Sequence, residues 1–169
     1  MAVALTLLQE RDVDRDLYLF DTFEGMTPPK EIDTCFDGTS AQAQLDGNSD
    51  KSSWIWAIAG IDDVRQNMQS TEYPQNKIHY VKGPVEATIP SEAPTGPIAL
   101  LRLDTDWYES TKHELTHLFP LLCEGGILII DDYGHWQGAR KAVDEYLASL
   151  GRPTFLHRID YTGRLLIKH

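Results

Sequence analysis

The sequence has few cysteines and no long apolar run, and each shortage excludes a class of protein. Its 169 residues include only two cysteines, Cys35 and Cys123, with no CxxC or Cys/His metal spacing. A disulfide scaffold or zinc site is therefore not expected, and a reducing compartment is. No segment approaches the roughly 20 apolar residues of a membrane-spanning helix. The apolar start, residues 1–8, lacks a basic region and a cleavage site, so it predicts the end of a helix in a cytoplasmic protein.

Positive charge is also scarce. The chain has 15 Lys and Arg residues against 26 Asp and Glu residues, which gives a formal net charge of −11. An acidic surface repels nucleic acid and anionic membranes, so neither is expected as a partner, whereas a small molecule or a cation is. Length and composition fit one domain over residues 1–169.

Four short apolar runs, each ending in a polar residue, are typical of buried parallel strands; they cover residues 17–21, 78–82, 98–104 and 127–131. Helices are expected over 61–68, over 139–150, and from a capping box of Thr111 and Glu114 to a stop at Gly125 and Gly126. Two last runs, 154–159 and 164–167, predict an antiparallel hairpin. This order describes an α/β fold with a mostly parallel open sheet.

Residues 27–60 interrupt this alternation. They are rich in Pro, Asp, Gly, Ser and Gln and are too long for an ordinary connection, so they predict a long loop or lid insertion. Near the end of this segment, Trp54 and Trp56 either cover a ligand or anchor the loop to the core.

The strand ends are acidic, and ligands of an open α/β sheet bind at the carboxyl ends of strands. Asp21 ends one strand, Asp104 and Asp106 follow another, and Asp131 and Asp132 follow a third. Carboxylates gathered at one edge repel each other unless a cation neutralises them. The oxygen-only set of Asp104, Asp131 and Asp132 suits Mg²⁺ first, with Mn²⁺ or Ca²⁺ as alternatives. The competing interpretation is that Asp131 and Asp132 only cap a strand and begin a turn.

The Asp-x-Asp pair of Asp104 and Asp106 leaves a second enzyme class open. Such pairs occur in metal-dependent glycosyltransferases that use nucleotide sugars. They also occur in aspartyl-phosphate phosphatases, but Tyr108 stands where that pattern has Thr.

Longer motifs resemble the macrocin O-methyltransferase family, whose members methylate sugar hydroxyls. The resemblance rests on LDTDWYEST at 103–111 and GGILIIDDYG at 125–134, and extends to FDTFEGM at 20–26, VKGPVEATIP at 81–90 and RIDYTGR at 158–164. It implies an S-adenosylmethionine-dependent and Mg²⁺-dependent O-methyltransferase with a Rossmann-like class I sheet. The acceptor would be a hydroxyl of a sugar or a similar small molecule.

The resemblance also implies roles for single residues. Asp106 matches the family's proposed general base, Asp21 ends the strand whose acid would hold the cofactor ribose, and Gly83 lies where the chain passes the adenine. The positions that match the metal-binding aspartates are Asp104, Asp131 and Asp132.

Four further residues lie within these motifs or directly after them. His135 is a competing base, although a loop histidine bonded to backbone is the alternative. Trp107, Tyr133 and Trp136 either form apolar walls for a sugar or belong to the core.

No glycine precedes Asp21, whereas a Rossmann-type cofactor site has a glycine-rich turn roughly 20 residues before the ribose acid. We therefore expect an N-terminally truncated domain that lacks the strand between those ending at Asp21 and Asp104. Unpaired strand edges favour association, so we expect a homo-oligomer that buries Leu17, Leu19, Ile98 and Leu100. A non-catalytic remnant that self-associates is the alternative function.

Overall fold

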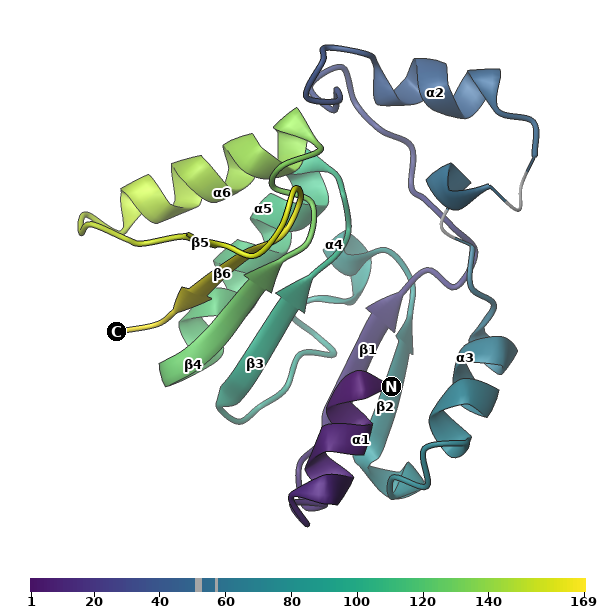
Figure 1. Cartoon of the computed structure of the whole chain (residues 1–169), viewed down its shortest axis with the longest axis vertical. Coiled ribbons are helices and arrows are strands. Elements are labelled where there is room, and N and C mark those ends of the chain that lie inside the picture. The colour runs from purple at the N-terminus through teal and green to yellow at the C-terminus, as the bar shows by residue number, and fades with distance from the viewer. Residues whose placement is uncertain (51–52, 57) are drawn as a thin grey trace.

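The computed structural model describes residues 1–50, 53–56 and 58–169, and their strands form two separate sheets (Figure 1). In the smaller sheet, β1 (Leu17–Asp21) pairs in parallel with β2 (Ile78–Lys82). The larger sheet has the order β3-β4-β6-β5. Its parallel pair is β3 (Ile98–Leu103) and β4 (Leu122–Ile130), and its antiparallel hairpin is β5 (His157–Arg158) and β6 (Arg164–Ile167). This arrangement confirms the α/β class, the parallel strands and the hairpin predicted from the sequence.

Helices pack on both sheets and bury the apolar sides of their strands. On the smaller sheet, α1 (Ala2–Gln9) and α3 (Ile61–Gln69) share an apolar cluster that includes Ala4, Met68 and Ile78. The core of the larger sheet contains side chains from α4 (Val85–Thr88), α5 (Tyr108–Leu118) and α6 (Gln137–Ser149). The carboxyl ends of β1 to β4 point the same way (Figure 1). Asp21 ends β1, and Asp104 and Asp131 directly follow β3 and β4, so all three lie at this end of the strands.

Two helix boundaries differ from the sequence prediction. The predicted capping box is wrong, because α5 begins at Tyr108 and Thr111 lies inside the helix. The predicted glycine stop is also wrong. The α-helix ends at Leu118, a 3-10 turn covers Phe119–Leu121, and Gly125 and Gly126 lie within β4, where their backbones bond to Lys168. The helix therefore ends beside Pro120, which cannot donate a helical hydrogen bond.

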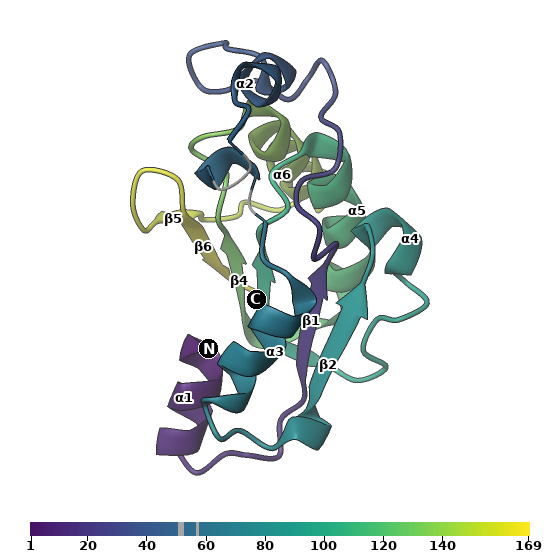
Figure 2. The same ribbon diagram turned by 90° about the vertical axis from the view of Figure 1, so that its right-hand side faces the viewer.

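The segment 27–60 contains regular structure of its own. Ser40 caps α2 (Ala41–Gly47), and a 3-10 turn covers Trp54–Trp56. In both views α2 lies beyond the carboxyl ends of the strands (Figures 1 and 2). An apolar cluster ties the segment to the larger sheet's helices; it contains Cys35, Ala41, Leu45, Ile55, Trp107, Trp136 and Ala139.

Two strand edges face each other across the boundary between the sheets. Within the described ranges, β1 pairs only with β2, and β3 pairs only with β4. Leu17, Leu19 and Ile98 are half-buried and Leu100 is 42% exposed.

The remaining short element, a 3-10 turn over Gln75–Lys77, leads into β2. Among the described residues, no helix is both long and apolar enough to cross a membrane.

Candidate functional site

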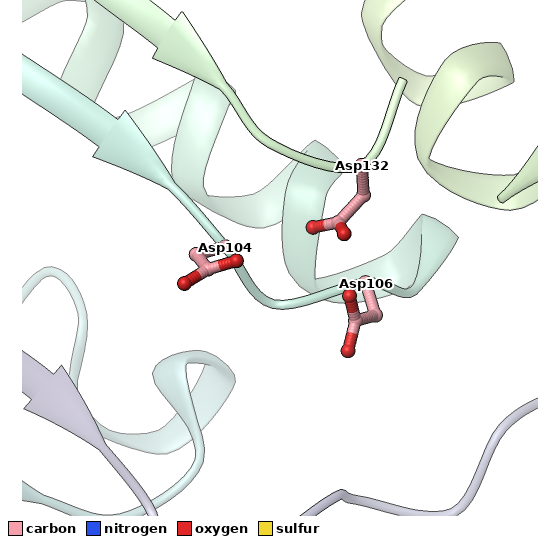
Figure 3. A group of neighbouring side chains, drawn as sticks. All are labelled: Asp104, Asp106 and Asp132. Atoms are coloured by element: carbon pink, nitrogen blue, oxygen red, sulfur yellow. The ribbon is translucent and has the colours of Figure 1, made fainter. Parts of the chain in front are cut away.

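Three carboxylates meet where β3 and β4 end (Figure 3). Asp104, Asp106 and Asp132 each place an oxygen within 4.8 Å of the other two. The parallel ladder causes this arrangement: the amide of Asp131 donates to the carbonyl of Leu103 at 3.0 Å, so the residues that follow both strands stay side by side.

Asp106 reaches the cluster through an uncommon backbone conformation. Its φ is +65°, in the left-handed region that non-glycine residues rarely occupy. The amide of Trp107 donates to the carbonyl of Thr105 at 2.7 Å, which closes a tight turn around Asp106 just before α5. Backbone strain of this kind clusters at functional sites. The turn directs the Asp106 carboxylate toward Asp132 (Figure 3).

Burial makes the ionised form of this cluster unfavourable. It is the largest cause that raises the pKa of Asp104, Asp106 and Asp132 above the usual range of an aspartate. Neighbouring negative charges raise the pKa values further, while Arg102 acts in the opposite direction on Asp104. Hydrogen bonds from Asp132 and Trp136 lower the pKa of Asp106. A divalent cation would offset both the desolvation and the repulsion, and an all-oxygen donor set fits a hard ion such as Mg²⁺.

The structure places Asp131 next to this cluster but outside it. Arg102 bridges two aspartates, with Nη1 at 2.5 Å from Asp104 Oδ2 and Nη2 at 3.0 Å from Asp131 Oδ1. Of the three predicted metal ligands, the geometry therefore brings Asp104 and Asp132 together with Asp106, while Asp131 pairs with an arginine.

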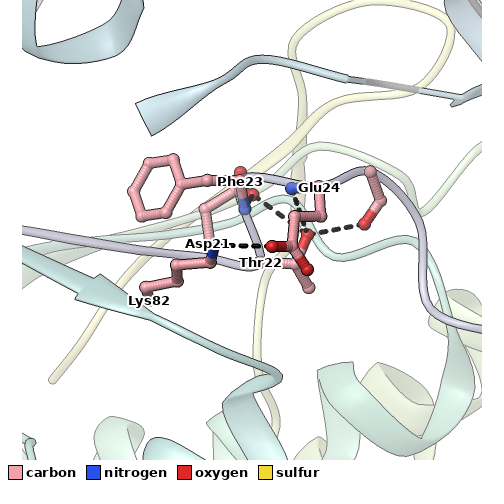
Figure 4. Close-up of polar contacts among 6 residues, drawn as sticks. Asp21, Thr22, Phe23, Glu24 and Lys82 are labelled. Carbon is pink, nitrogen blue, oxygen red and sulfur yellow. Dashed lines mark hydrogen bonds and ion pairs between the residues drawn. The ribbon is translucent and has the colours of Figure 1, made fainter. Parts of the chain in front are cut away.

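The two predicted cofactor residues lie side by side at the end of the smaller sheet. The amide of Gly83 donates to the carbonyl of Asp21 at 3.0 Å. Gly83 has φ +142°, which favours glycine, and a Cβ there would lie 3.0 Å from the Thr88 side chain. Asp21 Oδ1 accepts from the amide of Phe23 at 2.6 Å, and the adjoining turn is held by an ion pair between Lys82 and Glu24 (Figure 4).

The ring nitrogens of His135, the competing base, contact other side chains. Nε2 lies 3.4 Å from Cys35 Sγ and Nδ1 lies 3.2 Å from the Tyr161 hydroxyl. Burial lowers the pKa of His135 and raises that of the Cys35 thiol. Of the aromatic candidates, Trp107 and Trp136 are each 3% exposed and belong to the core.

Two buried acids support the site although the sequence did not predict them as site residues: Asp33 was not singled out, and Glu114 was predicted only as part of a capping box. Asp33 accepts from the amides of Lys30 and Tyr108, both at 2.8 Å, and so caps α5 from a distant segment. Glu114 accepts from the Thr105 hydroxyl at 2.8 Å, and burial raises its pKa to about 8. No local pattern could reveal Asp33, because its partner Tyr108 lies 75 residues away.

Comparisons with known proteins give one consistent family. Residues 1–168 match the family model described as Macrocin-O-methyltransferase (TylF). The chain is 32% identical over 158 residues to a demethyldecarbamoylnovobiocin O-methyltransferase of Streptomyces niveus, covering 93% of this chain and 57% of that enzyme. It is also 32% identical over 152 residues to an 8-demethyl-8-(2,3-dimethoxy-alpha-L-rhamnosyl)-tetracenomycin-C 4'-O-methyltransferase of Streptomyces olivaceus, covering 90% and 54%.

The solved structures agree with this match. The O-methyltransferase NovP superposes with a TM-score of 0.77 at 30% identity, covering 97% of this chain and 64% of that one. The chain thus spans between half and two thirds of the length of these proteins.

Proposed function

Because the chain belongs to the macrocin O-methyltransferase family, we propose that it transfers a methyl group from S-adenosylmethionine to a hydroxyl of a sugar or similar small molecule. The observation that carries the proposal is the cluster of Asp104, Asp106 and Asp132 at the ends of adjacent parallel strands. The relative named as a rhamnosyl-tetracenomycin-C 4'-O-methyltransferase supports the choice of a sugar hydroxyl as acceptor.

The chemistry needs alignment of sulfur, methyl and oxygen, together with removal of the hydroxyl proton. Asp104, Asp131 and Asp132 would hold the divalent cation, which would compete with Arg102 for Asp104 and Asp131. A bound Mg²⁺ would orient the sugar oxygens and lower the pKa of the reacting hydroxyl. Asp106 takes the proton, because its carboxylate lies beside Asp132 and is held by the turn before α5.

The remaining predicted residues take supporting roles in this proposal. Asp21 binds the cofactor ribose and Gly83 lets the chain pass the adenine, since both lie at the end of the smaller sheet. The segment 27–60 acts as a lid over the carboxyl ends of the strands. We propose the cytoplasm as the location, where S-adenosylmethionine is available.

The first prediction tests the base. We expect Asp106→Asn to lower the methylation rate roughly 10²–10⁴-fold, the usual contribution of general base catalysis. The measurement is methyl transfer from labelled S-adenosylmethionine to a rhamnoside with Mg²⁺ present. Asp62→Asn is the matched control, because that side chain is 94% exposed on α3. A fully active Asp106→Asn variant would move the role to His135 or to solvent.

The alternative of a non-catalytic remnant is separated by cofactor binding. Calorimetric titration with S-adenosylmethionine gives micromolar affinity if the cofactor site is functional and no measurable heat of binding if it is not. The glycosyltransferase alternative has no comparable support, because the family that matches residues 1–168 is one of O-methyltransferases.

A further inference from the structure

Two histidines stand one helical turn apart in the second half of α5. Residues 113–117 have the sequence HELTH, so His113 and His117 are four residues apart and lie on the same side of the helix. Their rings are neighbours, with centroids 4.4 Å apart and planes inclined by 51°. Both residues are half-buried, so neither is enclosed in the core. We call these two residues the histidine pair.

The backbone after α4 orients the ring of His113. Its Nε2 lies 2.8 Å from the carbonyl oxygen of Ile89, the residue that follows α4. Because a carbonyl oxygen only accepts, Nε2 carries the proton, and the neutral ring has its lone pair on Nδ1. Metal-bound histidines almost always donate their other ring N–H to a carbonyl, a carboxylate or water, which fixes the tautomer and the ring orientation. The contact with Ile89 therefore prepares Nδ1 of His113 to bind a metal ion.

The histidine pair favours a different ion from the carboxylate cluster. Imidazole nitrogen suits Zn²⁺, Ni²⁺ and Cu²⁺, whereas Mg²⁺ prefers oxygen ligands. The scarcity of cysteine argues against a thiolate zinc site, but it does not bear on a site made of imidazoles. The ring of His117 contacts His113 and has no hydrogen bond to any residue in the described ranges, so its nitrogens are available to a metal ion. The net charge of −11 also favours uptake of a cation.

The glutamate between the two histidines faces the interior. In metalloproteases with the spacing H-E-x-x-H on a helix, this glutamate is the general base for a metal-bound water. Here Glu114 is 5% exposed and accepts from the Thr105 hydroxyl at 2.8 Å, on the side of α5 that supports the carboxylate cluster. Among the described residues, no carboxylate joins the histidine pair in a group of three close ligand atoms. The arrangement therefore indicates metal binding without a base for hydrolysis.

We propose that the histidine pair binds one divalent transition-metal ion, Zn²⁺ in the first place, with water in the remaining coordination positions. This site is separate from the one at the strand ends, and it has a structural role. The ion links two successive turns of α5, and the hydrogen bond from His113 extends the link to Ile89 beside the neighbouring α4 (Figure 2). Because the unfolded chain does not hold the two rings together, the ion binds the folded state preferentially and stabilises it.

Calorimetric titration with ZnCl₂ in the presence of excess MgCl₂ tests the inference without any turnover. We expect His113→Gln and His117→Gln each to weaken zinc binding by roughly 10–100-fold or more, because loss of even a hydrogen-bond partner of a metal ligand has an effect of that size. His157→Gln is the matched control, since that histidine is exposed on β5. Asp132→Ala, which alters the strand-end carboxylates, should keep the histidine-dependent zinc site.

Melting curves with and without ZnCl₂ give a second measurement and show whether each variant folds. Zn²⁺ should raise the melting temperature of the wild type and of His157→Gln, but not that of the double variant His113→Gln/His117→Gln. If the double variant does not fold, His117→Gln alone decides the question, because the His117 ring has no hydrogen bond to lose among the described residues. No zinc binding by the wild type, equal zinc affinity in the wild type and His117→Gln, or loss of zinc binding in Asp132→Ala would overturn the inference.

Discussion

Arg102 lies between two of the carboxylates that we propose as metal ligands. Its guanidinium contacts Asp104 and Asp131 and compensates part of their charge. A cation that enters the site must therefore compete with an arginine for these oxygens. Asp106 also lies near Asp104 and Asp132, so separate substitutions of Asp131 and Asp106 test the proposed ligand set.

The second prediction concerns that ligand set. Mg²⁺ should raise the melting temperature, because it binds the folded state preferentially. Asp132→Ala and Asp131→Ala should each abolish this increase, whereas the exposed-residue control Asp62→Ala should keep it. Thermal unfolding with and without MgCl₂ provides the measurement. If Asp131→Ala retains the increase and Asp106→Asn loses it, then Asp106 is the third ligand and another group is the base.

The third prediction concerns Glu114. Its pKa is raised from 4.5 to about 8, chiefly by burial and further by Glu86, Asp104 and Asp132. Between these two values the unfolded chain has released the proton and the folded chain has kept it. The contribution of Glu114 to stability is therefore fully present below about pH 4.5 and is lost as the pH rises toward 8.

Urea unfolding at pH 5.5 and 7.5 measures this effect. Between these two pH values, the free energy of unfolding should fall less for Glu114→Gln than for the wild type, because glutamine has no proton to release. Glu109→Gln is the control, since Glu109 lies on the same helix with half its side chain exposed. Equal pH dependence in Glu114→Gln and the wild type would contradict the prediction.

At the scale of elements, the strands were predictable and the helix ends were not. The apolar runs at 17–21 and 78–82 coincide with β1 and β2, because buried parallel strands must be continuously apolar. The start of α5 depends instead on Asp33, a contact that local sequence patterns do not contain. The same holds for the site: the sequence placed acids at strand ends, but only the fold shows that Asp106 replaces Asp131 in the cluster.

The fourth prediction tests the contact between the segment 27–60 and α5. Asp33→Ala removes the acceptor for two backbone amides and should cost about 1–3 kcal/mol of unfolding free energy, the usual penalty for an unsatisfied buried group. Gly138→Ala should cost a similar amount, because its Cβ would lie 2.0 Å from Asp33 Oδ1. Chemical denaturation measures both. Asp46→Ala, on the exposed face of α2, should change little, and an equal loss there would show that Asp33 has no special role.

At the scale of the whole molecule, the parallel strands β1 to β4 run in one direction, but among the described residues no strand of one sheet pairs with a strand of the other (Figure 1). The described strands leave one edge of β1 and one edge of β3 without a strand partner. Exposed edges are templates for pairing with another chain, and they are costly if they are buried unpaired. Helices pack on each sheet separately, so direct closure of β1 onto β3 would have to bring those helices together.

The fifth prediction follows from these edges. We expect light scattering coupled to size exclusion to report a dimer or larger species whose population rises with concentration. Leu100→Lys should shift it toward monomer, because Leu100 is 42% exposed on β3 and a lysine on an edge strand opposes pairing. Leu5→Lys, at 43% exposure on α1, tests whether any added charge has the same effect. A stable wild-type monomer would contradict the prediction. Equal dissociation by both variants would instead place the contact away from the strand edges.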